Sequence, residues 1–230
     1  MTATTPDLWH HYGRIRAATD RNVPDSFYWT WEQDSGPGTE VLGDVDGACV
    51  GDLGAGSARH AAHVATRHQP ARVIAVDSSP AQTEMATRLF GHLAPRLQIV
   101  GSDVVDHLHA VDGTYDVLYS VFGAVDFTDP RELLPAAAAA LRPGGRLVFS
   151  TLAHYLSGAP AQPDVTAGRV GAKTPDGKAT TMARWVLEEQ VWVKLLDQAG
   201  FTDTSVEVWP ATSVRPRTAG TLLVEARRTG

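Results

Sequence analysis

Cysteine, lysine and long apolar runs are all scarce in this sequence. Cys49 is the single cysteine among 230 residues, which excludes an internal disulfide and a cysteine-based zinc cluster and is typical of a reducing cytoplasm. The longest apolar stretch, residues 133–141, is mostly alanine, includes Pro135, and falls far short of the roughly 20 residues that span a bilayer. The first residues show no basic region followed by an apolar one, so we expect no signal peptide and no membrane partner.

Positive charge is also in deficit. Lys and Arg together number 20 and Asp and Glu 26, which gives a formal net charge of −6. Nucleic acids and anionic membranes bind surfaces with clustered positive charge, and no run of basic residues with interleaved aromatics is present to follow a phosphate backbone. We therefore expect a small-molecule partner and no nucleic acid, for a chain that is a monomer or a homodimer.

What the sequence does contain is a regular series of short apolar segments within one domain, residues 1–230. Strands rich in branched and aromatic residues are predicted at 48–53, 72–76, 97–100, 115–121 and 146–152. Segments compatible with helices lie between them, at 58–68, 80–93 and 131–141. Apolar strands that alternate with helices indicate a parallel sheet covered on both faces, so the expected fold is a doubly wound, Rossmann-like α/β fold.

The pattern changes after residue 152. Residues 153–181 contain several prolines and glycines and show little periodicity, so we predict a loop-like insertion after the fifth strand. A helical pattern resumes at 182–199, and two further strands are predicted at 205–209 and 221–226. The prediction is a mostly parallel, seven-stranded sheet with helices on both faces, preceded by an N-terminal helical lid at 1–47.

A glycine-rich loop follows the first predicted strand, in Gly51-Asp-Leu-Gly-Ala-Gly-Ser-Ala-Arg59. Gly54 and Gly56 allow a tight turn and close backbone approach at a helix N-terminus, the edge of a parallel sheet where ligands bind. A dinucleotide fingerprint needs a small residue where this sequence has Arg59. Asp52 would repel a pyrophosphate but attract a cationic amine, and no Gly-Lys-Ser/Thr follows, which excludes a phosphate-binding loop of that type.

Two further predicted strands also end in an acid. Asp77 ends the second strand and is placed to accept hydrogen bonds from ribose hydroxyls. Asp103 follows the third strand, where it is placed to accept from an adenine amino group while Val104 packs on the ring. Asp77 also has a structural explanation, because an acid before Ser-Ser-Pro80 is a common helix cap. Three acids at successive strand ends, beside a Gly-x-Gly loop, indicate a pocket for a cationic adenosine derivative.

These segments together resemble the class I S-adenosylmethionine-dependent methyltransferases of small molecules. The matching segments are Val50-Gly-Asp-Leu-Gly-Ala-Gly-Ser-Ala-Arg59, Val73-Ile-Ala-Val-Asp-Ser-Ser-Pro80, Ser102-Asp-Val104, Tyr115-Asp-Val-Leu-Tyr-Ser-Val121 and Leu141-Arg-Pro-Gly-Gly-Arg-Leu-Val-Phe149. The resemblance implies S-adenosylmethionine as cofactor, bound by a core of residues 48–152 and 182–228. It places Asp52 near the methionine end of the cofactor, Asp77 at the ribose and Asp103 at the adenine amine. Ser78, Val104 and Ser120 are further expected contacts, and Ala58 stands where the family usually has a third glycine.

The residues around the methyl acceptor are less clearly marked. Six of the 17 aromatic residues lie within the first 31 positions, where they either form a lid over cofactor and acceptor or attach the N-terminal segment to the core. Members of the family often lay an N-terminal tyrosine over the cofactor, which makes Tyr12 the candidate; Tyr28 is a candidate at the acceptor. His154 and Tyr155 follow the fifth strand, where the acceptor is expected, and histidine titrates near physiological pH. Ordinary packing is the alternative explanation for both.

No metal site is expected. His60 and His63 share one helix face but lack an acidic third ligand nearby. Asp126 and Asp129 follow the fourth strand and leave the metal-dependent catechol branch of the family open.

The predicted function is transfer of a methyl group to a small-molecule acceptor by in-line displacement, in the cytoplasm. With 17 Arg and 3 Lys among the 20 basic residues, the composition and the aromatic N-terminal segment favour secondary metabolism and an aromatic or indolic acceptor. The overall pattern is similar to bacterial enzymes that methylate indole rings in natural-product biosynthesis, with residues 153–181 as a substrate-side insertion. Two alternatives stay open: a protein that binds S-adenosylmethionine without transferring the methyl group, and a nicotinamide-dependent oxidoreductase, which Arg59 disfavours.

Overall fold

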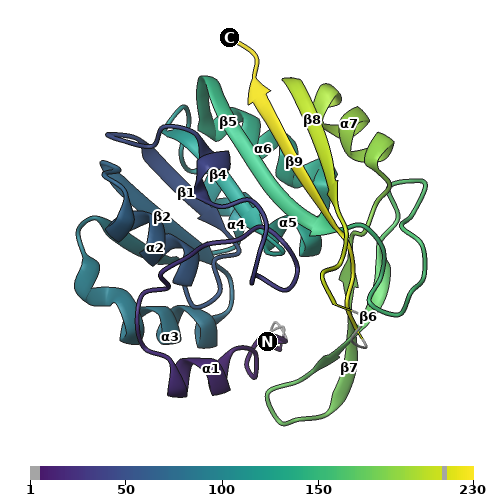
Figure 1. Cartoon of the computed structure of the whole chain (residues 1–230), viewed down its shortest axis with the longest axis horizontal. Coiled ribbons are helices and arrows are strands. Elements are labelled where there is room, and N and C mark those ends of the chain that lie inside the picture. The colour runs from purple at the N-terminus through teal and green to yellow at the C-terminus, as the bar shows by residue number, and fades with distance from the viewer. Residues whose placement is uncertain (1–5, 214–216) are drawn as a thin grey trace, which may run out of the picture.

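A computed structural model describes residues 6–213 and 217–230 and contains one seven-stranded sheet in the order β3-β2-β1-β4-β5-β9-β8 (Figure 1). The strands are β1 Cys49–Leu53, β2 Arg72–Asp77, β3 Leu97–Gly101, β4 Tyr115–Val121, β5 Leu141–Leu152, β8 Phe201–Trp209 and β9 Thr221–Arg228. Strands β1 to β5 pair in parallel, and β9 is antiparallel to both of its neighbours. The predicted mostly parallel α/β sheet is confirmed.

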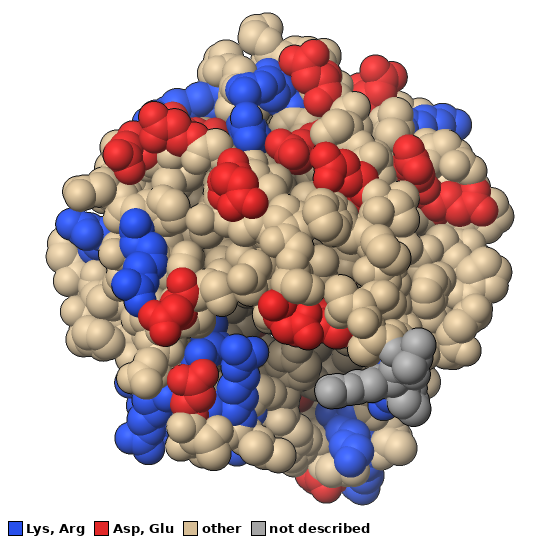
Figure 2. All heavy atoms as spheres, viewed as in Figure 1, with Lys and Arg blue, Asp and Glu red and all other residues tan. Residues whose placement is uncertain are grey.

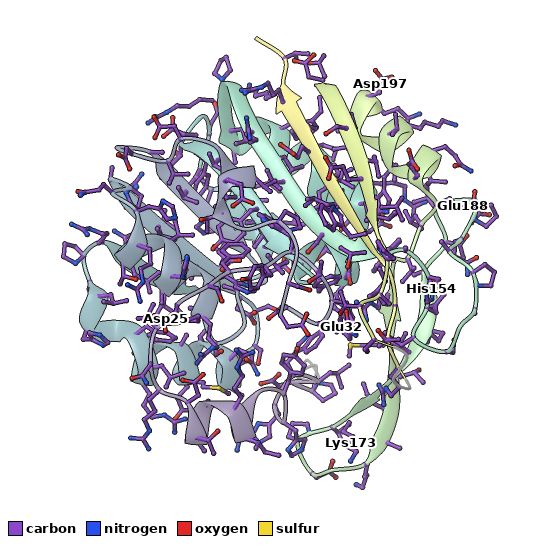
Figure 3. All side chains as sticks on the ribbon, viewed as in Figure 1. Asp25, Glu32, His154, Lys173, Glu188 and Asp197 are labelled. Carbon is purple, nitrogen blue, oxygen red and sulfur yellow. The ribbon has the colours of Figure 1, made fainter. Side chains whose placement is uncertain are left out.

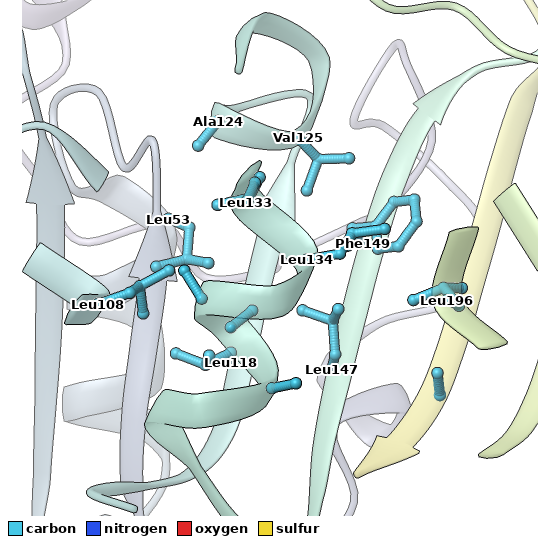
Figure 4. Close-up of a cluster of buried hydrophobic side chains, with 14 of the residues drawn as sticks. Leu53, Leu108, Leu118, Ala124, Val125, Leu133, Leu134, Leu147, Phe149 and Leu196 are labelled. Carbon is cyan, nitrogen blue, oxygen red and sulfur yellow. The ribbon is translucent and has the colours of Figure 1, made fainter. Parts of the chain in front are cut away.

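Helices cover the two faces of this sheet. They are α1 Arg14–Thr19, α2 Arg59–Arg67, α3 Pro80–Phe90, α4 Val104–His109, α5 Ala124–Phe127, α6 Pro130–Ala140 and α7 Glu189–Gln198, with short 3-10 turns at Thr39–Leu42 and Gly91–Leu93. One apolar core lies between the sheet and α4, α5, α6 and α7, and the other between the sheet and α2, α3 and the N-terminal segment. Figure 4 shows α6 on the first face, with Leu133 near Val125 and Leu134 beside Phe149.

Local sequence explains where several helices begin. The Ser79 side chain accepts a hydrogen bond from the Gln82 amide, with Pro80 at the first helical position of α3. Asp129 caps α6 in the same way, again followed by a proline. These helices were predicted to within a few residues, because their caps are written in adjacent positions.

The segment after β5 differs from the prediction. Instead of a loop, it contains an antiparallel hairpin of β6 Gly168–Lys173 and β7 Ala179–Arg184, which forms a second sheet. The predicted helix at 182–199 therefore begins only at Glu189, since residues 182–184 belong to β7. The hairpin was missed because its residues are small or polar and most are at least partly exposed, so no apolar pattern marks them.

The N-terminal segment and the hairpin meet beyond the carboxyl ends of the parallel strands. In Figure 1, α1 lies beside α3, and the β6–β7 hairpin extends from the opposite half of the molecule. The two segments are in contact near the hairpin tip, where the His11 imidazole Nε2 lies 3.2 Å from the Thr174 carbonyl oxygen. Within the described residues no helix is long and apolar enough to cross a bilayer.

Candidate active site

The strand order reverses between β1 and β4, and the glycine-rich loop lies at this switch point. The amides of Gly54 and Ala55 donate to the Val76 carbonyl oxygen at 2.9 and 3.0 Å, which folds the loop over the end of β2. Gly54 has φ +75°, and a Cβ there would lie 2.2 Å from the Ala124 nitrogen. Glycine is therefore required at 54 by the turn after β4, which packs directly on the loop.

The methyltransferases that this sequence resembles usually have a third glycine at the position of Ala58. The backbone of Ala58 is in the left-handed region, with φ +58°. The alanine is fully buried at the N-terminus of α2. A left-handed alanine is strained by about 1–2 kcal/mol, so the loop holds an alanine in a conformation that glycine would adopt without this cost.

Asp77 lies beside this loop at the end of β2. Its Oδ2 accepts from the Gly56 amide at 2.7 Å and its Oδ1 from the Ser79 amide at 2.9 Å. Burial raises the pKa of Asp77, and the two amide hydrogen bonds oppose that rise. A carboxylate has lone pairs for about four hydrogen bonds, so Asp77 can still accept from a ribose, and the adjacent Ser78 is exposed.

Asp103 is exposed at the end of β3. Its Oδ1 caps α4, accepting from the amides of Val105 at 2.8 Å and Asp106 at 3.3 Å. Helix capping thus occupies one oxygen and leaves Oδ2 for a ligand amine. Val104 is buried in the core beneath, which limits the ring surface it can offer.

Asp52 is the most strongly perturbed acid of the site. It is 2% exposed on β1, and its Oδ2 has no hydrogen-bond partner among the described residues. Burial raises the pKa of Asp52 to about 7; the nearby Tyr119 hydroxyl opposes this rise, and the charge of Asp77 adds to it. A buried carboxylate without a counter-ion fits a cationic ligand, such as the ammonium group of S-adenosylmethionine.

Ser120 joins the ends of β1 and β4. Its hydroxyl donates to the Leu53 carbonyl at 2.8 Å and accepts from the Val125 amide at 3.4 Å, and the side chain is fully buried. Backbone groups therefore use this hydroxyl, and its expected contact with the cofactor stays a prediction.

The N-terminal segment is attached to α3 by two side chains that the sequence did not single out. Asp7 Oδ2 accepts from the Ser79 hydroxyl at 2.9 Å and the Ala81 amide at 3.2 Å. Gln82 Nε2 donates to the carbonyls of Trp9 at 2.9 Å and Tyr12 at 3.0 Å. These contacts hold the segment beside Asp77. No local sequence pattern predicts these contacts, because 70 to 74 positions separate the partners.

The aromatic residues of the N-terminal segment divide between lid and core. Tyr12 is 64% exposed, with its ring edge-on to Trp9 at 5.6 Å, which is compatible with the predicted lid. Trp29 is fully buried, and its ring lies 6.1 Å from that of Tyr119. Trp29 therefore attaches the segment to the core, and Tyr28 beside it is half-buried.

His154 and Tyr155 both make contacts with the backbone. The His154 Nδ1 lies 3.1 Å from the Tyr155 carbonyl, and Nε2 lies 3.4 Å from the Gly220 amide, which suits a neutral ring protonated on Nδ1. The Tyr155 hydroxyl donates to the Arg184 carbonyl at 3.4 Å and packs against Gly168, at the base of the hairpin. Figure 3 shows His154 on the hairpin side of the molecule. Their catalytic roles stay predictions.

Four aromatic rings from two separate parts of the chain gather beyond β4, and we call them the aromatic cluster: Trp9, Trp31, Phe122 and Phe127. Trp9 meets Phe127 at 4.6 Å and Trp31 meets Phe122 at 5.1 Å, both edge-on, and all four rings are half-buried. The Arg184 guanidinium of β7 lies 5.4 Å from the Trp31 ring centre and 5.1 Å from that of Phe127. Cluster and arginine together form an apolar surface with one cation beside the turn that packs on Gly54.

The two acids that made a metal site possible from the sequence are both paired with arginines. Asp126 is ion-paired with Arg184, and Asp129 with Arg131 while it caps α6. Burial raises the pKa of Asp126, against the opposing effect of the Arg184 charge. Across residues 6–213 and 217–230, no group of three or more His, Cys, Asp or Glu could hold a metal ion.

Comparison with known proteins agrees with this geometry. Residues 50–145, which contain all three strand-end acids, match a family described as a methyltransferase domain. Over 211 residues the chain is 28% identical to trans-aconitate 2-methyltransferase of Deinococcus radiodurans, covering 89% of this chain and 73% of the relative. This chain is an S-adenosylmethionine-dependent methyltransferase.

Two solved structures share the fold of this methyltransferase. An S-adenosylmethionine-dependent methyltransferase from Mesorhizobium loti has a TM-score of 0.59 and 23% identity, covering 82% of this chain and 94% of the other. The 1,6-didemethyltoxoflavin N1-methyltransferase of Burkholderia thailandensis, solved with its acceptor and S-adenosylhomocysteine, has a TM-score of 0.54 and 22% identity, covering 84% and 75%. S-Adenosylmethionine is the cofactor of this chain.

Proposed function

We propose that this methyltransferase acts on a small, flat acceptor that lies against the aromatic cluster. The observation that carries the proposal is the gathering of Trp9, Trp31, Phe122 and Phe127 beyond the end of β4. Half-buried aromatic faces favour a planar ring, by stacking or by edge-to-face contact. An aromatic acceptor, with indoles as one class, fits such a surface.

The relatives support a small acceptor without naming this one. The Burkholderia enzyme is named for a small acceptor, and the Deinococcus relative for trans-aconitate. We propose a monomeric or homodimeric cytoplasmic enzyme that does not act on nucleic acid. The formal charge of −6 supports this, as do the interspersed acidic and basic side chains on the face in Figure 2, which is hollowed below its centre.

The chain's own residues have separate proposed tasks around the cofactor. Asp52 binds the cationic methionine end of the cofactor, Asp77 with Ser78 the ribose, and Asp103 with Val104 the adenine. The glycine loop at Gly54 and Gly56 gives the cofactor close access to the backbone. Ser120 keeps that loop against the turn after β4, and the N-terminal segment with Tyr12 covers the bound cofactor.

On the acceptor side the main contribution is positioning. The bound cofactor supplies the methyl group on its sulfonium sulfur, and correct alignment of an acceptor supplies much of the rate in such a displacement. The aromatic cluster would orient the acceptor and exclude water. Tyr28, His154 and Tyr155 are proposed to complete the acceptor side, where a hydroxyl acceptor would need a group that takes its proton.

Transfer of a labelled methyl group from S-adenosylmethionine tests the proposal. Phenols, aromatic amines and indoles would be compared with trans-aconitate, and products identified by mass. We expect transfer to at least one ring compound, reduced at least tenfold in a Phe127→Ala variant that still binds S-adenosylhomocysteine. Transfer to trans-aconitate alone, or to no ring compound, would overturn the aromatic acceptor.

A further inference from the structure

Arg184 is the one charged side chain that contacts the aromatic cluster through a ring face, among the described residues. It ends β7, and its side chain is only 7% exposed. The ring centres of Trp31 and Phe127 lie 5.4 and 5.1 Å from its guanidinium carbon, so the cation lies close to both rings. An acceptor against these rings would lie within reach of this guanidinium.

The hydrogen bonds of this arginine are incomplete. Nε donates to Asp126 Oδ2 at 3.0 Å and Nη2 donates to the same oxygen, while Nη1 has no hydrogen-bond partner among the described residues. A guanidinium has five N–H donors in a planar fork. Nη1 is not among the buried polar atoms that lack a partner, so it keeps some access to solvent and to a ligand. Two of the five are used here. The opposite edge of the fork can therefore bind a second anionic group, and a carboxylate matches its geometry.

We propose that Arg184 is a specificity-determining residue that binds a carboxylate of the acceptor, so that the enzyme prefers planar acids to their neutral analogues. This inference rests on the proposed function and narrows its substrate class. Asp126 binds the Nε edge of the Arg184 guanidinium and fixes its position. The rings of Trp31 and Phe127 fix the orientation of the guanidinium plane. The carboxylate then fixes the acceptor in a single orientation against Phe127, in front of the glycine loop.

Binding to the protein saturated with S-adenosylhomocysteine tests this without turnover. The probes are matched pairs of acid and amide: benzoate with benzamide, indole-3-acetate with indole-3-acetamide, and trans-aconitate with its triamide, measured by calorimetry. We expect at least one acid to bind ten times more tightly than its amide. Arg184→Met should remove that preference while the affinity for S-adenosylhomocysteine changes less than twofold. Arg169→Met is the matched control, because Arg169 is exposed on the same hairpin and bonded only to Thr181.

A second variant separates recognition from a purely structural ion pair. Asp126→Asn removes the counter-ion and keeps the shape, so the acid-to-amide preference should increase. A structural pair would lose stability in this variant and leave the preference unchanged or lower. If Arg184→Met does not fold, Arg184→Lys gives the same comparison, with the preference expected to fall several-fold because the planar fork is lost.

The proposal is overturned if no acid is preferred by the native protein, including the case in which neither member of any pair binds. It is equally overturned if folded Arg184→Met keeps the preference. Failure here is distinguishable from failure of the proposed function. Methyl transfer to neutral ring compounds without any acid preference would leave the aromatic acceptor standing and remove only the role of Arg184.

Discussion

The cofactor edge of the sheet and the acceptor side meet at the same loop but are built in different ways. At the cofactor edge, Asp77 and Asp103 accept hydrogen bonds from backbone amides within two or three residues or from the neighbouring glycine loop. On the acceptor side, side chains contact side chains from distant segments, as in the ion pair of Arg184 with Asp126, 58 positions apart. The first arrangement depends on short motifs, and the second on how separate segments pack.

This difference shows where each region should be sensitive to change. Backbone-built loops tolerate few residues at positions of close approach, since the main chain itself must move. We expect side-chain clusters to tolerate substitution in the fold but to lose selectivity, because each member contributes only one or two of the contacts. Variants where the glycine loop packs on the turn after β4 should therefore have the largest effects. Variants at the contacts of the N-terminal segment should have the smallest.

The largest effect is expected where the glycine loop meets the turn after β4, in Gly54→Ala. The added Cβ would lie 2.2 Å from the Ala124 nitrogen and 2.8 Å from the Gly123 carbonyl carbon, so the loop and the turn after β4 must separate. We expect loss of S-adenosylhomocysteine binding by more than 100-fold, or a chain that does not fold. Calorimetry and circular dichroism measure both.

Gly56→Ala is the matched control for that variant. Gly56 also has a positive φ, +55°, but a Cβ there would meet only Gln82 Oε1 at 3.6 Å. The cost is then conformational strain of about 1–2 kcal/mol in a folded protein. Equal behaviour of the two variants would show that the contact between the loop and the turn does not set the sensitivity.

The next largest effect is on the pH dependence of the unfolding free energy, and it involves the cofactor edge alone. Burial raises the pKa of Asp52 from 3.8 to about 7, so the folded chain holds this proton more tightly than the unfolded chain does. The resulting stabilisation is fully present below about pH 4 and is lost as the pH rises through 7, on the order of 2–4 kcal/mol. In Asp52→Asn the unfolding free energy, measured with urea from pH 4.5 to 8, should lose that decline. The same slope in both proteins would contradict the assignment.

The cofactor edge could largely be predicted from the sequence, and the acceptor side could not. The sheet, the glycine loop and the strand-end acids were predictable because each depends on residues within one strand and its following turn. The β6–β7 hairpin was not, because its small and polar residues carry no apolar alternation. Arg184 and Asp7 were missed because only the folded chain brings them to Asp126 and Ser79. Trp29 belonged to a correctly noticed aromatic group, but sequence could not separate a core tryptophan from a lid residue.

A smaller loss, again confined to the cofactor edge, is expected from Asp77→Ala. The variant leaves the Gly56 amide without its 2.7 Å partner and removes the proposed acceptor for ribose hydroxyls. Hydrogen bonds to a charged group contribute about 1.5–3 kcal/mol, so S-adenosylhomocysteine should bind roughly 10- to 100-fold more weakly. Glu84→Ala, at an exposed position on α3, is the control and should bind normally. An Asp77→Ala protein with native affinity would remove the ribose role.

The smallest effect is expected where the N-terminal segment attaches to the cofactor edge, in Asp7→Ala. This variant loses the bonds from the Ser79 hydroxyl and the Ala81 amide, but the fold should persist because Asp7 lies outside both cores. We expect a two- to fivefold weaker affinity for S-adenosylhomocysteine, about 1 kcal/mol at most, with faster amide exchange over residues 6–20. Gln82→Ala should act in the same direction, and Asp25→Ala, an exposed acid paired with Arg67, should not. If exchange rises while affinity stays native, the segment is attached to the edge without covering the cofactor, and the lid must be sought on the hairpin side.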